Sequence, residues 1–327
     1  MATELKRPPV TAAMKQHLDT GGRGALIVKD VELGAPLPHS GNCPFWTTDL
    51  YAAACPDETD PSAEPVVVVE FDYSRLKISR RKAAMPYTFR HIDADELHFV
   101  HRGHATYLTE VGNFDAPAGR FIFITRGIGY RVVPHTADYM SVIFESEEHI
   151  NLEDDVAKAR IPIIRPEFPP KLDNAGVKQW EERLRTRSWH LSVQRPNDPL
   201  ETVEVGRDEQ PAFALDLHTI PAHQPTSPKG VLPFVVFRGP SFHLEIAMPK
   251  TPMPFFHRNV RANETVFAHH GSGDRESLLG NVSSPVGSMT NYPKGIDHRV
   301  GDRGGESTCL IWETLGDVRL APGLATT

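Results

Sequence analysis

The sequence contains little cysteine and no long apolar run. Its three cysteines, Cys43, Cys55 and Cys309, are odd in number and widely spaced, so they form neither a disulfide framework nor a zinc-knuckle spacing. No apolar run reaches the length of about 20 residues that a membrane-spanning helix needs, and residues 1–20 lack the apolar core of a signal peptide. We therefore expect a cytoplasmic protein in a reducing compartment, without a membrane partner.

Positive charge is scarce as well. The net charge is -7, from 35 Lys and Arg against 42 Asp and Glu. Because phosphate binding needs a concentrated basic surface, nucleic acid is not an expected partner. The short basic run Arg80-Arg81-Lys82 is expected to be the solvated end of a strand.

Long helical heptads are also few. Instead, 29 prolines and 24 glycines separate short β-branched and aromatic runs, which include 66–71, 96–100, 120–124 and 140–144, then 234–237, 243–246, 265–267 and 307–312. Short strands at such spacing, with turn residues between them, favour a sandwich or barrel. Residues 177–187 are the one helix candidate. We expect an all-β fold.

The two series of strands match each other. Residues 89–103 align with 258–271, so that Glu96 matches Glu264, and each lies seven residues before a glycine, Gly103 or Gly271. Such a repeat predicts two similar β-barrel domains. The expected organisation is an irregular N-terminal arm (1–63), a first barrel (64–160), a linker with connecting strands (161–230), a second barrel (231–317) and a tail (318–327).

His257, Glu264 and His298 are candidate metal ligands in the second barrel. Two imidazoles and a carboxylate are the ingredients of a facial triad, which leaves half of the coordination sphere open. Nitrogen and oxygen donors without thiolate suit Fe(II), Mn(II) or Ni(II) better than structural zinc. Asn259 is either a weak fourth donor or a support for the ligands. The alternative is a coincidence of polar residues at turn ends, because the chain has 16 histidines.

Segments 253–259, 264–267 and 287–298 resemble the iron-binding region of homogentisate 1,2-dioxygenases, and 95–103 and 126–131 resemble the amino-terminal half of that family. The resemblance covers about residues 64–317. It implies a double cupin with one Fe(II) site, in the second cupin, bound by His257, Glu264 and His298. It also implies a base near His223. In the first copy Tyr130 stands where His298 stands in the second, so no complete metal site is expected there.

The chain departs from the family pattern at residues that would contact the substrate. Tyr292 replaces a histidine of the family's last block, and the tyrosine that helps to hold the substrate carboxylate has no counterpart in residues 269–273. A pocket without carboxylate partners does not favour an anionic substituent. Substituted hydroquinones and aminophenols then join homogentisate as candidate substrates, and the length resembles the large subunit of two-component hydroquinone dioxygenases.

We therefore expect an Fe(II) enzyme that cleaves the ring of a small hydroquinone-type aromatic substrate with O2. The expected catalytic residues are His223 and Tyr292, and the expected substrate-binding residues are Phe255, Phe256, Phe267 and Asn259. The N-terminal arm is expected to pack on the barrel or on another chain, in a homo-oligomer or with a small partner subunit. The alternatives are a non-ring-cleaving cupin oxygenase or isomerase, and a non-catalytic binding protein.

Overall fold

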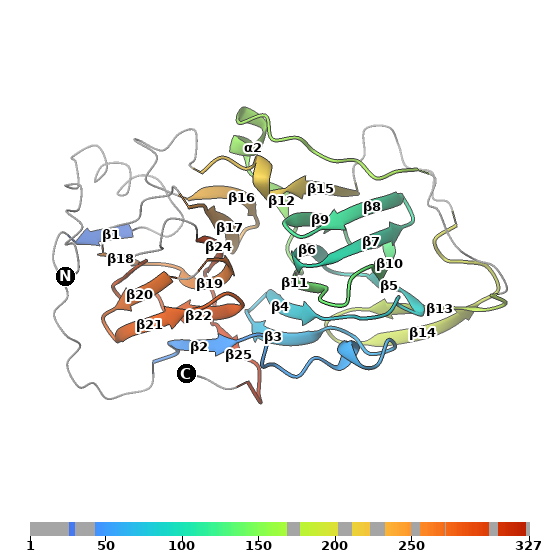
Figure 1. The fold of residues 1–327 in the computed structure, drawn as a ribbon, viewed down its shortest axis with the longest axis horizontal. Coiled ribbons are helices and arrows are strands. Elements are labelled where there is room, and N and C mark those ends of the chain that lie inside the picture. The colour runs from blue at the N-terminus through green and yellow to red at the C-terminus, as the bar shows by residue number, and fades with distance from the viewer. Residues whose placement is uncertain are drawn as a thin grey trace. The chain divides into compact units, whose positions relative to one another are not determined.

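The computed structural model describes residues 26–29, 43–168, 177–201, 211–222, 233–249, 256–271, 273–300 and 307–324. These segments are nearly all strands (Figure 1), with one α-helix, α2 (Asp154–Lys158), and two short 3-10 helices, η1 (Pro56–Glu58) and η2 (Leu217–Thr219). None of these helices is long and apolar enough to cross a membrane. The all-β fold class expected from the sequence is confirmed.

The described residues divide into two compact units. The first unit comprises those within 54–150 and 161–220, and the second comprises those within 1–53, 151–160 and 221–327. The segment expected as a linker is therefore split, since the strands after residue 177 belong to the first unit. The expected arm is split in the same way, because residues 54–63 belong to the first unit.

The first unit is a jelly roll of two sheets. One sheet has the strand order β15-β9-β6-β11-β4-β3 and the other β14-β13-β5-β10-β7-β8. The strands are β3 (Val66–Glu70), β4 (Ser74–Ser79), β5 (Tyr87–His91), β6 (Asp95–Arg102), β7 (His104–Thr109), β8 (Gly112–Pro117), β9 (Arg120–Ile124), β10 (Gly129–Pro134), β11 (Met140–Ser146), β13 (Trp180–Arg185), β14 (His190–Arg195) and β15 (Ala212–Asp216). Alternate residues of both sheets, among them Tyr87, Val100, Tyr107 and Ile122, form one buried core.

The second unit repeats this arrangement. Its sheets have the orders β12-β16-β17-β24-β19-β22-β2 and β1-β18-β23-β20-β21. The strands are β1 (Leu26–Lys29), β2 (Trp46–Asp49), β12 (Asn151–Leu152), β16 (Phe234–Arg238), β17 (Phe242–Ala247), β18 (Phe256–Asn259), β19 (Asn263–His270), β20 (Gly273–Ser277), β21 (Gly280–Ser284), β22 (Ser288–Tyr292), β23 (His298–Val300), β24 (Thr308–Thr314) and β25 (Arg319–Leu320). The N-terminal strands β1 and β2 thus complete the edges of this barrel.

The internal repeat holds a constant spacing. Strands β3, β6 and β11 begin at residues 66, 95 and 140, and β16, β19 and β24 begin at 234, 263 and 308, so each difference is 168. The turn glycines follow the same spacing with matching left-handed backbones: φ is 71° and 68° at Gly103 and Gly271, and 84° and 86° at Gly127 and Gly295. The two barrels are therefore copies of one unit, and a position within 66–146 has its counterpart 168 residues later, within 234–314.

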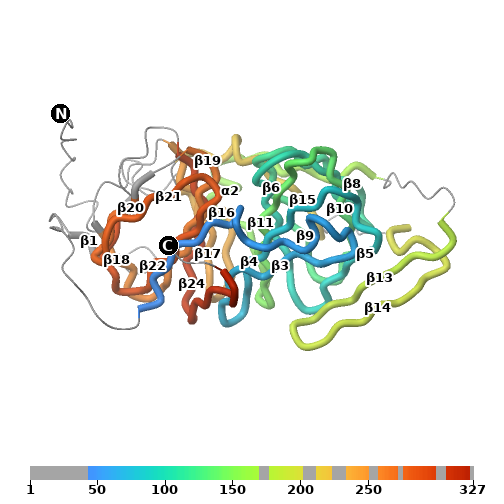
Figure 2. The backbone as a smooth tube through the Cα atoms, turned by 60° about the horizontal axis from the view of Figure 1, so that its bottom comes forward, coloured from blue at the N-terminus to red at the C-terminus, as the bar shows by residue number. Residues whose placement is uncertain are grey.

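Two local expectations were wrong. The helix expected over 177–187 contains β13, which pairs in parallel with β5 and antiparallel with β14 in a hairpin that Figure 2 draws in yellow-green. Its composition favours helix, but pairing on both edges overrode that propensity. The basic run is not wholly solvated either, because Arg81 is buried and lies 3.6 Å from the carboxylate of Asp57.

Candidate metal centre

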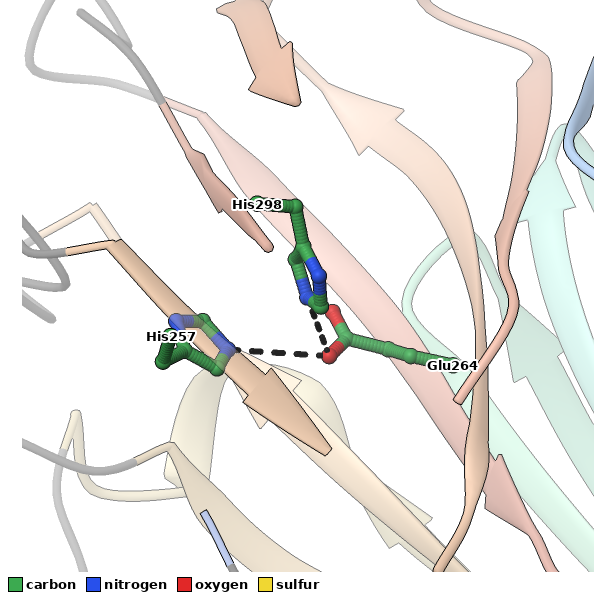
Figure 3. Close-up of side chains that lie close together, drawn as sticks. All are labelled: His257, Glu264 and His298. Atoms are coloured by element: carbon green, nitrogen blue, oxygen red, sulfur yellow. Dashed lines mark hydrogen bonds and ion pairs between the residues drawn. The ribbon is translucent and has the colours of Figure 1, made fainter. Parts of the chain in front are cut away.

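Three strands of the second unit bring His257, Glu264 and His298 together (Figure 3). His257 on β18 and His298 on β23 are direct cross-strand partners. Glu264 comes from β19 of the other sheet, and its carboxylate points toward the two imidazoles. Residues that are far apart in the sequence therefore meet inside one barrel, as a compact metal site requires.

The donor atoms lie at short distances. Oε2 of Glu264 is 2.9 Å from Nε2 of His298 and 3.8 Å from Nε2 of His257. Ligands that are each about 2.1 Å from a common ion and occupy neighbouring positions lie about 3 Å apart. All three side chains are buried, so water does not screen them. Two nitrogens and one carboxylate in this arrangement fit a divalent cation.

The electrostatics of the three groups favour a bound cation. Burial raises the pKa of Glu264, but the charges and hydrogen bonds of His298 and His257 outweigh burial and hold that pKa well below its usual range. Burial lowers the pKa of His298, yet the neighbouring Glu264 carboxylate raises it overall. The site thus keeps an ionised carboxylate in a dry interior, where it needs positive charge from protons or from a metal.

Neighbouring groups orient the ligands. Nδ1 of His298 donates to the carbonyl of Ile296 at 2.9 Å, so Nε2 is the nitrogen that faces Glu264. Nδ2 of Asn259 donates to Oε2 of Glu264 at 3.0 Å. The Oδ1 atom of Asn259 is buried and has no hydrogen-bond partner among the described residues. Asn259 therefore supports the carboxylate in this structure, and its oxygen can accept a further hydrogen bond.

Tyr292 lies beside the cluster. It is the cross-strand partner of Glu264, and its ring stacks on that of His298 with centroids 4.3 Å apart and planes at 14°. Its hydroxyl is buried and donates to no described residue, and the nearby Arg275 guanidinium opposes the rise in its pKa that burial causes. Tyr292 is thus placed to contact a molecule bound at the three candidate ligands.

Of the remaining expected site residues, the structure describes the side chain of Phe267 alone. Phe267 lies three positions after Glu264 on β19, so its side chain projects from the opposite face and does not wall the cluster. Val266 takes the facing position instead and packs with Tyr292. His223 and Phe255 lie outside the described residues, as does the side chain of Phe256.

The first barrel has aromatic rings in place of the two histidines and keeps the glutamate. By the 168-residue spacing, Phe89 stands for His257 and Tyr130 for His298, with ring centroids 5.7 Å apart. Glu96 stands for Glu264, but it lies 3.9 Å from the ammonium of Lys77, which also forms an ion pair with Glu145. A lysine charge therefore balances the carboxylates there. Both His/Asp/Glu/Cys groupings with metal-ligand spacing among the described residues belong to the second unit.

The second of these groupings was not expected from the sequence. His243 lies 3.0 Å from Glu245 and 3.2 Å from Glu313. Burial and the charge of Glu313 raise the pKa of Glu245 to about 7, and the two carboxylates raise the pKa of His243 well above its usual range despite burial. A protonated His243 between two carboxylates accounts for this cluster. The repeat could have indicated it, because Lys77 corresponds to Glu245.

Two strands of the N-terminal segment border the candidate site. β1 pairs antiparallel with β18, so that Val28 is opposite His257. β2 pairs with β22, the strand that carries Tyr292. Strands β1 and β2 therefore pack on the second barrel, one of the two arrangements expected for the arm, and border two strands that form the site.

No protein-family model matches the chain. Solved structures similar to it include protein Ylba from E. coli (10% identity, covering 87% of this chain and 96% of that chain, TM-score 0.44). They also include a cupin 2 conserved barrel domain protein from Leptotrichia buccalis (11%, 77% and 91%, 0.42) and a formate complex of oxalate decarboxylase from Lactobacillus farciminis (12%, 86% and 90%, 0.48). At this level of identity the likeness is one of backbone architecture.

Proposed function

We propose that the second barrel binds Fe(II) through His257, Glu264 and His298 and uses O2 to cleave the ring of a hydroquinone-type substrate. The supporting observation is the convergence of two imidazole nitrogens and one buried carboxylate, without thiolate, from three strands. Fe(II) held by these three residues would bind a substrate oxygen and O2 and would pass electron density from the substrate ring to O2, so that the substrate is the net reductant. The family resemblance of segments 253–259, 264–267 and 287–298 supports iron and ring cleavage.

The chain's own residues would orient the reactants and exclude water. Asn259 keeps the Glu264 carboxylate turned toward the imidazoles through its 3.0 Å hydrogen bond, and the Ile296 carbonyl keeps the His298 ring in one tautomer. The Tyr292 hydroxyl, which donates to no described residue, is available to donate to a substrate oxygen. Fixed geometry in a buried site lowers the entropic part of the barrier. We further propose assembly as a homo-oligomer or with a small subunit.

The test is anaerobic reconstitution with Fe(II), metal analysis, and then O2 uptake with homogentisate, hydroquinone, substituted hydroquinones and aminophenols. The expected result is uptake with at least one of them, together with the absorbance of a ring-opened product. O2 uptake without ring opening would indicate a different oxygenase, and stoichiometric metal without O2 uptake would indicate an isomerase. Protein without stoichiometric metal would indicate a binding protein. A Glu264→Gln variant should lose uptake, and the matched variant Glu96→Gln in the first barrel should retain it.

A further inference from the structure

A phenylalanine of the N-terminal segment lies against the candidate site. Phe45 immediately precedes β2, and its ring centroid is 5.6 Å from that of Tyr292, with the planes at 52°. It packs against the apolar cluster that contains Tyr292 and Val266. Because Tyr292 in turn stacks on His298, three rings in succession connect the N-terminal segment to a candidate metal ligand.

The segment that carries Phe45 is fixed to the strands of the site. The carbonyl of Pro44 accepts a hydrogen bond from Nδ2 of Asn291 on β22 at 2.7 Å. Oδ1 of the same Asn291 accepts from Oγ1 of Thr265 on β19 at 3.1 Å, and both of these side chains are fully buried. Each of the two residues adjoins a residue of the site in the sequence, so Phe45 is held in place relative to the site.

The first barrel lacks both aromatic side chains at the corresponding positions. The counterpart of Tyr292, 168 residues earlier, is Ile124 on β9, and β15 pairs with β9 as β2 pairs with β22. By this pairing the position of Phe45, one residue before β2, corresponds to Ala212, the partner of Ile124. Both aliphatic residues are buried in the core of the first barrel. An isoleucine and an alanine therefore suffice for the fold, and the aromatic pair is specific to the barrel with the candidate ligands.

We propose that Phe45 is a positioning residue, which holds the ring of Tyr292 against the His298 imidazole and so fixes the Tyr292 hydroxyl beside the candidate ligands. This inference rests on the proposed function, and it assigns to the N-terminal segment a part in the same site. Aromatic rings attract one another in preferred tilted geometries, so Phe45 restricts the orientation of Tyr292 more than an aliphatic side chain would. A displaced hydroxyl would lose its hydrogen bond to the substrate, because that bond depends on distance and angle.

The first test follows the His298 imidazole in metal-free protein labelled with 13C at histidine Cε1, at one fixed pH. Its NMR signal is assigned by its loss in His298→Gln. A proton over the face of an aromatic ring is shielded, so the signal should move downfield when the stacked ring of Tyr292 tilts away. We expect Phe45→Ala to move it part of the way toward its position in Tyr292→Leu. Phe45→Tyr keeps the ring and should leave the signal in place.

Two further variants separate positioning from packing. In Phe45→Ala/Tyr292→Leu the signal should coincide with that of Tyr292→Leu, because Phe45 acts through Tyr292. The matched control is Phe213→Ala on β15, the equivalent strand of the first barrel. Phe213 is 8% exposed, so this variant loses the same side chain and should not move the signal. If Phe45→Ala does not fold, Phe45→Leu replaces it and should give a smaller downfield shift. An unmoved signal in the folded variant, or an equal shift without Tyr292, would overturn the proposal.

A second readout uses turnover. In the Fe(II)-loaded enzyme Phe45→Ala should lower kcat/KM roughly twofold to tenfold, as for the loss of one neutral hydrogen bond. It should cause no further loss in a Tyr292→Phe background, and a loss of equal size there would contradict the proposal. The NMR result requires neither iron nor turnover. The expected shift in a protein that opens no ring would therefore refute the proposed function and leave the role of Phe45 supported.

Discussion

Glu264 and Glu96 show how one residue type serves two purposes. Each occupies the second position of an eight-residue strand, and each is the cross-strand partner of a glutamate, Glu313 or Glu145. Their surroundings differ, since two imidazoles face Glu264, whereas Glu96 lies 3.9 Å from both the ammonium of Lys77 and the imidazole of His98. A carboxylate beside a fixed lysine is already neutralised, whereas one beside imidazoles can be neutralised by a metal.

Removing any one candidate ligand should abolish tight iron binding. We expect His257→Ala, Glu264→Ala and His298→Ala to lose stoichiometric Fe(II), because two remaining donors rarely hold this ion against water. The measurement is metal analysis after gel filtration of anaerobically loaded protein. Glu96→Ala is the matched control and should retain its iron. A variant that keeps full iron occupancy would remove its residue from the ligand set.

Lys77 should be a large contributor to the stability of the first barrel. Lys77→Met leaves Glu145 and Glu96 buried with less compensation, and the loss of one partner of a buried ion pair costs about 3–5 kcal/mol. Chemical denaturation followed by circular dichroism gives the free energy of unfolding. The double variant Lys77→Met/Glu145→Gln should recover part of the loss. If Lys77→Met matches the unaltered protein, the ammonium is not a structural replacement for a metal.

The same ion pair predicts a dependence of stability on pH. Burial raises the pKa of Glu145, but the Lys77 charge and His91 outweigh burial and hold it well below the ordinary value of 4.5. A lowered folded-state pKa stabilises the fold above the unfolded-state value and ceases to do so as the pH falls from about 4.5 through the folded value. The first barrel should therefore weaken in that acid range. In Lys77→Met the acid-dependent part of the unfolding free energy should be smaller.

At the scale of elements, the turns of the repeat depend on left-handed glycines. Gly103 has φ +71° in the turn between β6 and β7, and a Cβ there would lie 2.3 Å from Oγ1 of Thr136. Gly127 has φ +84°, but a Cβ there would meet nothing within 4 Å. A substitution at Gly127 therefore tests backbone strain alone, whereas one at Gly103 tests strain and a steric clash together.

Alanine at these two glycines should have unequal effects. Gly127→Ala should cost about 1–2 kcal/mol, the strain of a left-handed alanine. Gly103→Ala adds a clash with Thr136 and the backbone of Tyr139. This clash costs about 1–3 kcal/mol in addition to the strain. Urea midpoints of the two variants measure the difference. Equal midpoints would show that the turn after β6 relaxes to admit the methyl group.

The edge strands β1 and β13 show that the local sequence does not fix whether a strand pairs in parallel or antiparallel. β1 and β13 add to equivalent strands of the two barrels, β18 and β5. β1 joins antiparallel and β13 joins in parallel, although the strands that receive them are related by the repeat. The direction of such an addition depends on the path of the chain outside the repeat rather than on the residues of the strand itself.

At the scale of the whole molecule, the duplication leaves one barrel with ligands and one without. We expect one Fe(II) per chain at saturation. In the first barrel Phe89 and Tyr130 stand where the second barrel has its two imidazoles, and Lys77 neutralises the carboxylates. Titration with Fe(II) under argon, followed by removal of free metal, gives the ratio. A ratio of two would place a further site in the chain, and the matched Glu264→Ala variant would then retain one.

The sequence alone determined the all-β class and the repeat, and the family resemblance of its segments predicted that His257, Glu264 and His298 meet. These depend on strand periodicity, on turn glycines and on residue types within short segments, all of which are readable along the chain. Only the tertiary structure decided which charges face one another. The pairing of Lys77 with Glu145 and the direct opposition of His257 and His298 depend on register between distant strands. Register is set by the packing of a whole barrel, so a single segment does not encode it.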